Sequence, residues 1–151
     1  MAITAEAVKE LRDSTGVSVM ECKKALEDAG GDMDHAKAIL LERAALIVAK
    51  KGDRELVAGT VASYIHNSAQ VGALVMLSCE TDFVSKNEEF TLLARDIAMH
   101  IAAMRPENVE MLLPEAFIKD PSKTIADLLS TATQKFGERI VIVHMSCFSV
   151  V

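Results

Sequence analysis

The chain has 151 residues, half of which are hydrophobic, and a formal net charge of −6. This length favours one ordinary domain, or a small domain joined to a larger one, and the hydrophobic content argues against global disorder. Acidic and basic residues are interspersed without a basic block, and the chain has no Trp and one Tyr. Direct binding of RNA or DNA is therefore not expected, because it needs basic surface and usually aromatic side chains for stacking.

Membrane, targeting and metal-binding signals are also missing from the sequence. No apolar run reaches the ~20 residues of a membrane-spanning helix, so no membrane association is expected. The first residues resemble neither a signal peptide nor a transit peptide, which predicts a cytoplasmic protein of bacterial type, with an organelle matrix as the alternative. The three cysteines are widely spaced and the four histidines form no HExxH pattern, so no disulfide framework, metal site or cofactor is predicted.

Residues 1–51 predict three short helices that form a compact bundle. Thr4 is a favoured N-cap residue for the first helix, and Asp32 is one for the third. Ser18 and Glu21 form a capping box at the start of the second helix. Small and apolar residues recur at helical spacing in each segment, as expected for helices that pack against one another.

Residues 52–151 predict an α+β domain, a three-stranded antiparallel sheet packed with helices. The alternating runs at residues 60–66 and 71–80 are separated by a polar turn, which is typical of a β-hairpin. The second run is apolar on both faces and is therefore expected to be the central strand. The remaining predicted elements are a helix over about 87–104, a short helix or turn over 108–117, a helix that starts at Pro121 and a strand over 138–150.

Enzymatic signatures are weak. Glu80 and Asp82 lie close together and could form an acid/base or metal pair, but no third ligand is indicated. A solvated strand end and a helix cap explain the same two carboxylates more simply. The sequence contains no nucleophile elbow and no phosphate-binding loop, so no catalytic residue is assigned and the chain is not expected to be an enzyme.

The segment TDFV, at the junction between a strand and a helix, has the features of a protein-binding site. Thr81 or Asp82 can cap the helix, and Phe83 then lies in its first turn. The ring either projects outward as an apolar anchor or folds back into the core, and the spacing alone does not decide between these alternatives. Protruding apolar anchors on rigid elements are typical of interaction sites.

A second cue is the segment TGVSVMECKKAL. Val19 and Met20 stand there next to Lys23 and Lys24, and exposed apolar residues beside lysines can form a docking patch. An ordinary loop followed by a solvated lysine pair explains the pattern as well. The pattern by itself therefore favours the simpler explanation.

Three stretches of the sequence resemble the elongation factor Ts family, whose members release GDP from elongation factor Tu during translation. The stretches are VKELRDSTGVSVMECKKALEDAGGDMDHA, CETDFVSKNEEF and IAMHIAAMRP. The resemblance implies a domain like the ubiquitin-associated domain over residues 1–51 and a dimerisation-type core over 52–151. It also implies a guanine-nucleotide exchange factor that binds elongation factor Tu in its GDP-bound and nucleotide-free states.

The resemblance assigns residues to this partner contact in two groups. The group expected to dislodge the partner's Mg²⁺ is Thr81, Asp82, Phe83 and Val84. The other expected contacts are Lys9, Arg12, Met20, Lys23, Gly72 and His100.

The chain departs from the family pattern between PENVEMLLPEAF and IKDPSKTI, where a long helical hairpin is missing, and it carries one core module. Short members of this kind can pair, so a homodimer joined through an exposed sheet edge is one expected arrangement. The alternative function is a ubiquitin-associated-type adaptor without exchange activity. The loop TGVSVM lacks the Met-Gly-aromatic pattern of such binders, which counts against this alternative.

Overall fold

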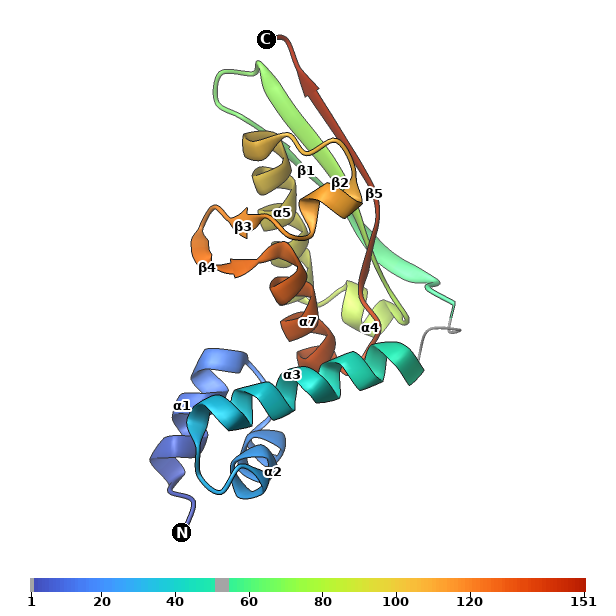
Figure 1. The fold of residues 1–151 in the computed structure, drawn as a ribbon. Coiled ribbons are helices and arrows are strands. Elements are labelled where there is room, and N and C mark those ends of the chain that lie inside the picture. Colours follow the sequence, from blue (N-terminus) through green and yellow to red (C-terminus); the bar gives the residue numbers. More distant parts are fainter. Residues whose placement is uncertain (1, 51–54) are drawn as a thin grey trace. The chain divides into compact units, whose positions relative to one another are not determined.

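The computed structural model describes residues 2–50 and 55–151 (Figure 1). Its described residues form two compact units, one of residues 2–50 and 130–138 and the other of residues 55–129 and 139–151. This grouping adds residues 130–138 to the N-terminal helices, whereas the sequence analysis placed them in the core. The division into domains at residues 51 and 52 stays a prediction, since this point of the chain lies outside the described residues.

The first unit contains the three expected N-terminal helices, and all three predicted N-caps are confirmed. The Thr4 hydroxyl accepts a hydrogen bond from the Ala7 amide at 3.2 Å, and the Ser18 hydroxyl accepts one from the Glu21 amide at 3.3 Å. The Asp32 carboxylate accepts one from the His35 amide at 2.7 Å. These helices are α1 (Ala5–Thr15), α2 (Val19–Asp28) and α3 (Met33–Lys50). The third helix has 18 residues and is therefore longer than expected.

The core of these helices is built from the small and apolar residues that recur at helical spacing. Burial raises the pKa of the Cys22 thiol, so this cysteine stays neutral and packs as a small hydrophobic residue, as predicted. The buried core residues are Val8, Leu11, Val17, Cys22, Ala25, Leu26, Ala29, Ala36 and Leu40.

The second unit is built on the predicted antiparallel sheet, which confirms the α+β fold class. Its strands are β1 (Ala58–Ile65), β2 (Val71–Cys79) and β5 (Val141–Ser149), in the order β1-β2-β5. Helix α5 (Glu88–Met104) lies along one face of this sheet (Figure 1), where it packs against β1 and β2. The buried face of β2 and the apolar stripe of α5 meet there through Ala73, Val75, Leu77, Phe90, Ile97 and Ile101.

The other face of the sheet is exposed and apolar. Strand β2 is central, as predicted. A strand that is apolar on both faces is usually covered on both sides, but here Leu74 and Met76 on the second face are exposed. We call this surface the open sheet face. Its large exposed apolar residues are Val61, Ile65, Leu74, Met76 and Phe148.

The segment between α5 and β5 differs from the prediction. The expected helix start at Pro121 is wrong, because residues 120–124 form a strand and the helix begins at Ile125. Thr124 and Asp127 set this start: the Asp127 carboxylate accepts a hydrogen bond from the Thr124 amide at 2.9 Å, and the Thr124 hydroxyl accepts one from the Asp127 amide at 3.1 Å. The remaining elements are α4 (Asp82–Ser85), α6 (Val109–Leu112), β3 (Ala116–Phe117), β4 (Asp120–Thr124) and α7 (Ile125–Phe136).

Strands β3 and β4 form a hairpin through a tight turn at Ile118 and Lys119. The sequence indicates that the long helical hairpin of the family is missing between residues 117 and 118. The turn of the β3–β4 hairpin lies at this position. Among the described residues, none of the helices combines the length and the apolar character that crossing a bilayer requires.

Candidate protein-binding site

Phe83 lies on a sharp corner between the central strand and a short helix. Strand β2 ends at Cys79, and α4 begins at Asp82. Of the two predicted capping residues, Thr81 is the N-cap: it has an extended backbone, and its hydroxyl accepts a hydrogen bond from the Val84 amide at 3.5 Å. The chain therefore turns within two residues from the sheet into the helix.

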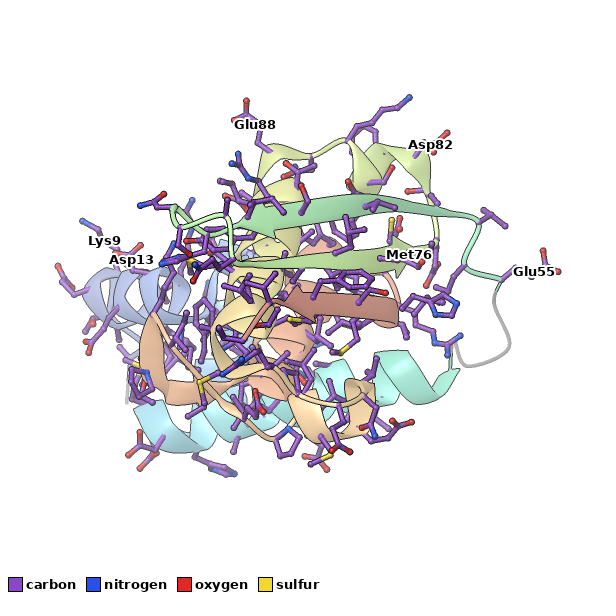
Figure 2. All side chains as sticks on the ribbon, turned by 90° about the horizontal axis from the view of Figure 1, so that it is seen from above. Lys9, Asp13, Glu55, Met76, Asp82 and Glu88 are labelled. Carbon is purple, nitrogen blue, oxygen red and sulfur yellow. The ribbon has the colours of Figure 1, made fainter. Side chains whose placement is uncertain are left out.

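The aromatic ring of Phe83 projects from this corner. Its exposed fraction is 90%, whereas the next two residues, Val84 and Ser85, are buried. Phenylalanine is usually among the buried residues, so a ring this exposed on an ordered element is unusual. Of the two alternatives that the spacing left open, the ring adopts the outward one. Asp82 also points away from α4 (Figure 2).

Three hydrogen bonds hold the corner in place. The Ser85 hydroxyl donates to the Asp82 carbonyl at 3.1 Å, and the Cys79 thiol donates to the Thr81 carbonyl at 3.3 Å. The Glu80 carboxylate accepts a hydrogen bond from the Arg139 amide at 2.8 Å. Since Asp82 faces solvent while Glu80 binds the neighbouring backbone, the two carboxylates have different surroundings. Over residues 2–50 and 55–151, no group of three or more His, Cys, Asp or Glu residues is arranged to hold a metal ion.

A basic hollow lies between α1 and α2 of the first unit. Three of the predicted contact residues, Lys9, Arg12 and Lys23, line it together with Val19. We call it the α1–α2 hollow. It has a volume of about 390 Å³ and is completed by Ile3, Thr4, Ala5 and Val8. The structure therefore brings together lysines and an arginine around an apolar floor, although the sequence pattern favoured an ordinary loop.

Two exposed apolar residues follow the N-cap of α2. Val19 lines the hollow and is 51% exposed, and Met20 is 75% exposed. Lys9 points away from α1 (Figure 2), and Lys23 lies 3.9 Å from Glu27 in an exposed ion pair. Exposed pairs of this kind are weak, so Lys23 is available to a partner. The sequence could have indicated the hollow, since the spacing of Val19 and Lys23 places them on one side of a helix.

The two remaining predicted contacts have different positions. Gly72 lies on the open sheet face, and a Cβ atom added to it would lie 2.5 Å from the Cδ1 atom of Ile65. His100 is fully buried in the free chain, so it is a core position, and its expected contact with a partner stays a prediction. Its Nε2 atom lies 2.7 Å from Glu115, and its Nδ1 atom accepts a hydrogen bond from the Ile118 amide at 3.3 Å. His100 thus connects α5 to the β3–β4 hairpin.

Comparison with known proteins identifies the family. A sequence model described as "Elongation factor TS" matches residues 37–110 and 80–150 of the chain. The chain belongs to the elongation factor Ts family. Elongation factor Ts of Thermodesulfovibrio yellowstonii is 38% identical over 194 positions, which cover 99% of this chain and 97% of that protein. Elongation factor Ts of Leptospira biflexa serovar Patoc is 36% identical over 195 positions, covering 99% of this chain and 98% of that protein.

A third elongation factor Ts, from Acetivibrio thermocellus, is 38% identical over 183 positions, covering 91% of this chain and 85% of that protein. The alignment with the Thermodesulfovibrio protein spans 194 positions, whereas this chain has 151 residues. The relative therefore has residues without a counterpart here.

Proposed function

We propose that this chain is a guanine-nucleotide exchange factor that binds GDP-bound elongation factor Tu and accelerates the release of GDP. The observation that carries the proposal is the exposed Phe83 ring, held on an ordered corner of a member of the elongation factor Ts family. In this proposal Asp82 and Phe83 enter the partner, while Thr81 and Val84 hold the corner in its own unit. The chain does no covalent chemistry.

The mechanism is differential binding. The partner holds GDP through its phosphate-binding loop and a Mg²⁺ ion, and Mg²⁺ requires a nearly ideal octahedral shell. A rigid apolar ring inserted beside this site displaces the elements that complete the shell, so the partner loses affinity for GDP. By thermodynamic linkage, a factor that prefers the nucleotide-free partner lowers its nucleotide affinity by the same ratio.

The α1–α2 hollow provides a second contact in this proposal. Lys9, Arg12 and Lys23 surround an apolar floor, and Met20 is exposed nearby, so the hollow suits an acidic surface that carries an apolar side chain. Complementary charge of this kind mainly increases the rate and specificity of association. Gly72 remains a proposed contact, whereas His100 supports the fold from the interior.

The test is the release of labelled GDP from elongation factor Tu with and without this chain. We expect release to accelerate with increasing concentration of the chain and to reach a plateau. Binding without acceleration would instead support the ubiquitin-associated-type adaptor. Turnover of a substrate without the partner would support an enzyme.

We also propose that a second copy of the chain covers the open sheet face. Ile65, Gly72 and Phe148 are aligned in register across the three strands, and Met76 (Figure 2) lies between Val61 and His144 in another row. Phe148 is 76% exposed. The face also carries Ser63, Ser146 and His144 but is largely apolar, which suits the self-complementary interface of a twofold dimer. The proposed contact is thus the face of the sheet and not its edge, where the sequence analysis placed it.

Replacing Leu74 by Lys is expected to convert the dimer to a monomer, because a charge placed at the centre of an apolar interface loses its hydration without gaining a partner. Sedimentation velocity would show the wild type at twice the chain mass of 16.3 kDa and the variant at that mass. Leu92→Lys is the matched control, since Leu92 is similarly exposed but lies on α5. A wild type that sediments as a monomer at high concentration contradicts the proposal.

A further inference from the structure

Glu80 continues the sheet ladder into the corner that carries Phe83. The pairing of β2 with β5 ends at Ser78 and Val141. Two residues beyond these positions stand Glu80 and Arg139, and the Arg139 amide donates a hydrogen bond to the Oε1 atom of Glu80 at 2.8 Å. A side-chain carboxylate thus takes the place that a backbone carbonyl occupies in the regular ladder.

The hydrogen bond between Glu80 and Arg139 anchors the corner to the segment before β5. Glu80 immediately precedes Thr81, the N-cap of α4, and therefore lies between the last paired residues of β2 and the helix. Arg139 lies two residues before Val141, the first residue of β5. The bond is partly buried and its acceptor is charged, and both properties strengthen a hydrogen bond. It joins residues 59 positions apart, so it anchors the corner to a strand remote in sequence.

We infer that Glu80 is a positioning residue for nucleotide exchange, which holds the corner so that the Phe83 ring is presented in one direction. This inference rests on the proposed function. A group held in place on a rigid element acts more effectively than one that must be ordered during binding. Glu80 acts through Phe83 and does not itself touch the partner's metal site.

The kinetic test compares Glu80→Ala with Glu80→Gln in the full chain. Glu80→Ala is expected to lower the maximal rate of GDP release by about 10-fold, because it removes the hydrogen bond that the carboxylate accepts from the Arg139 amide. The concentration for half-maximal release should change little, because the α1–α2 hollow is intact. Glu80→Gln should restore most of the rate, since its amide oxygen still accepts a hydrogen bond from Arg139.

Two controls separate positioning from other effects. Glu88→Ala removes a carboxylate that points away from the ribbon near the start of α5 (Figure 2) and should leave the rate unchanged. In the double variant Glu80→Ala with Phe83→Ala, the rate should equal that of Phe83→Ala alone, because Glu80 acts through the ring. Rate losses that multiply in the double variant would overturn the inference.

Amide hydrogen exchange of the free chain gives a readout that does not need the partner. In Glu80→Ala, the Arg139 and Val84 amides should exchange faster than in wild type, while amides of α5 stay protected. Unchanged protection overturns the inference whatever the kinetics show. If wild type fails to accelerate GDP release, the proposed function is wrong. Faster amide hydrogen exchange in Glu80→Ala would then show that Glu80 stabilises the corner without a role in GDP release.

Discussion

Replacing Phe83 by Ala is expected to slow GDP release from elongation factor Tu by about 100-fold, a loss typical of a buried aromatic anchor at an interface. The ring is 90% exposed in the free chain, so its removal leaves no cavity in the core. The free energy of unfolding should therefore change by no more than about 0.5 kcal/mol. Stopped-flow release of labelled GDP, together with thermal unfolding of the variant, measures both quantities.

The control for this variant is Leu92→Ala, which removes an exposed apolar side chain from α5. It should leave GDP release at the wild-type rate. Phe83→Leu keeps part of the apolar volume and should fall between wild type and Phe83→Ala. If Phe83→Ala releases GDP as fast as wild type does, the ring is not the group that opens the partner's site.

The second large effect is expected from reversing charge in the α1–α2 hollow. Changing Lys9 and Lys23 together to Glu should raise the concentration needed for half-maximal exchange by about 100-fold, because two attractive contacts become repulsive. The maximal rate should change much less, since Phe83 is untouched. Added salt should weaken the wild-type interaction and partly restore that of the variant, because it screens both attraction and repulsion.

Lys24 offers a matched control for the hollow. It follows Lys23 directly and is also exposed, but it does not line the hollow. Lys23→Glu alone should therefore weaken binding more than Lys24→Glu does. Equal effects of the two substitutions would mean that only the net charge of the helix matters and would remove the hollow from the proposed contact.

Much of the fold could be predicted because its signals are local. Thr4, Ser18 and Asp32 cap helices, as their residue types and positions indicate. The hairpin of β1 and β2 follows from two alternating runs around a polar turn. The start of α7 was missed although its signal is also local: the pair Thr124 and Asp127 outweighs Pro121, which begins no helix here.

The candidate site could likewise be predicted only in part. The residue types of TDFV and its place after a strand were visible in the sequence, and Thr81 caps the helix as one of the two predicted options. The direction of the Phe83 ring could not be predicted from the sequence, because a helix residue can face inward or outward until its neighbours are packed. Helix α4 packs against β1 and β2, and Val84 and Ser85 are buried while Phe83 faces outward.

Sequence alone determined most of the helices and strands, the α+β class and the resemblance to the elongation factor Ts family, since these depend mainly on residues near one another in the chain. Tertiary structure decided that Phe83 is exposed, that His100 is buried and that one apolar face of β2 stays open. It also brought Glu80 to Arg139. These outcomes depend on contacts between distant segments, and no local pattern of residues specifies which face of a strand or helix such a contact will cover.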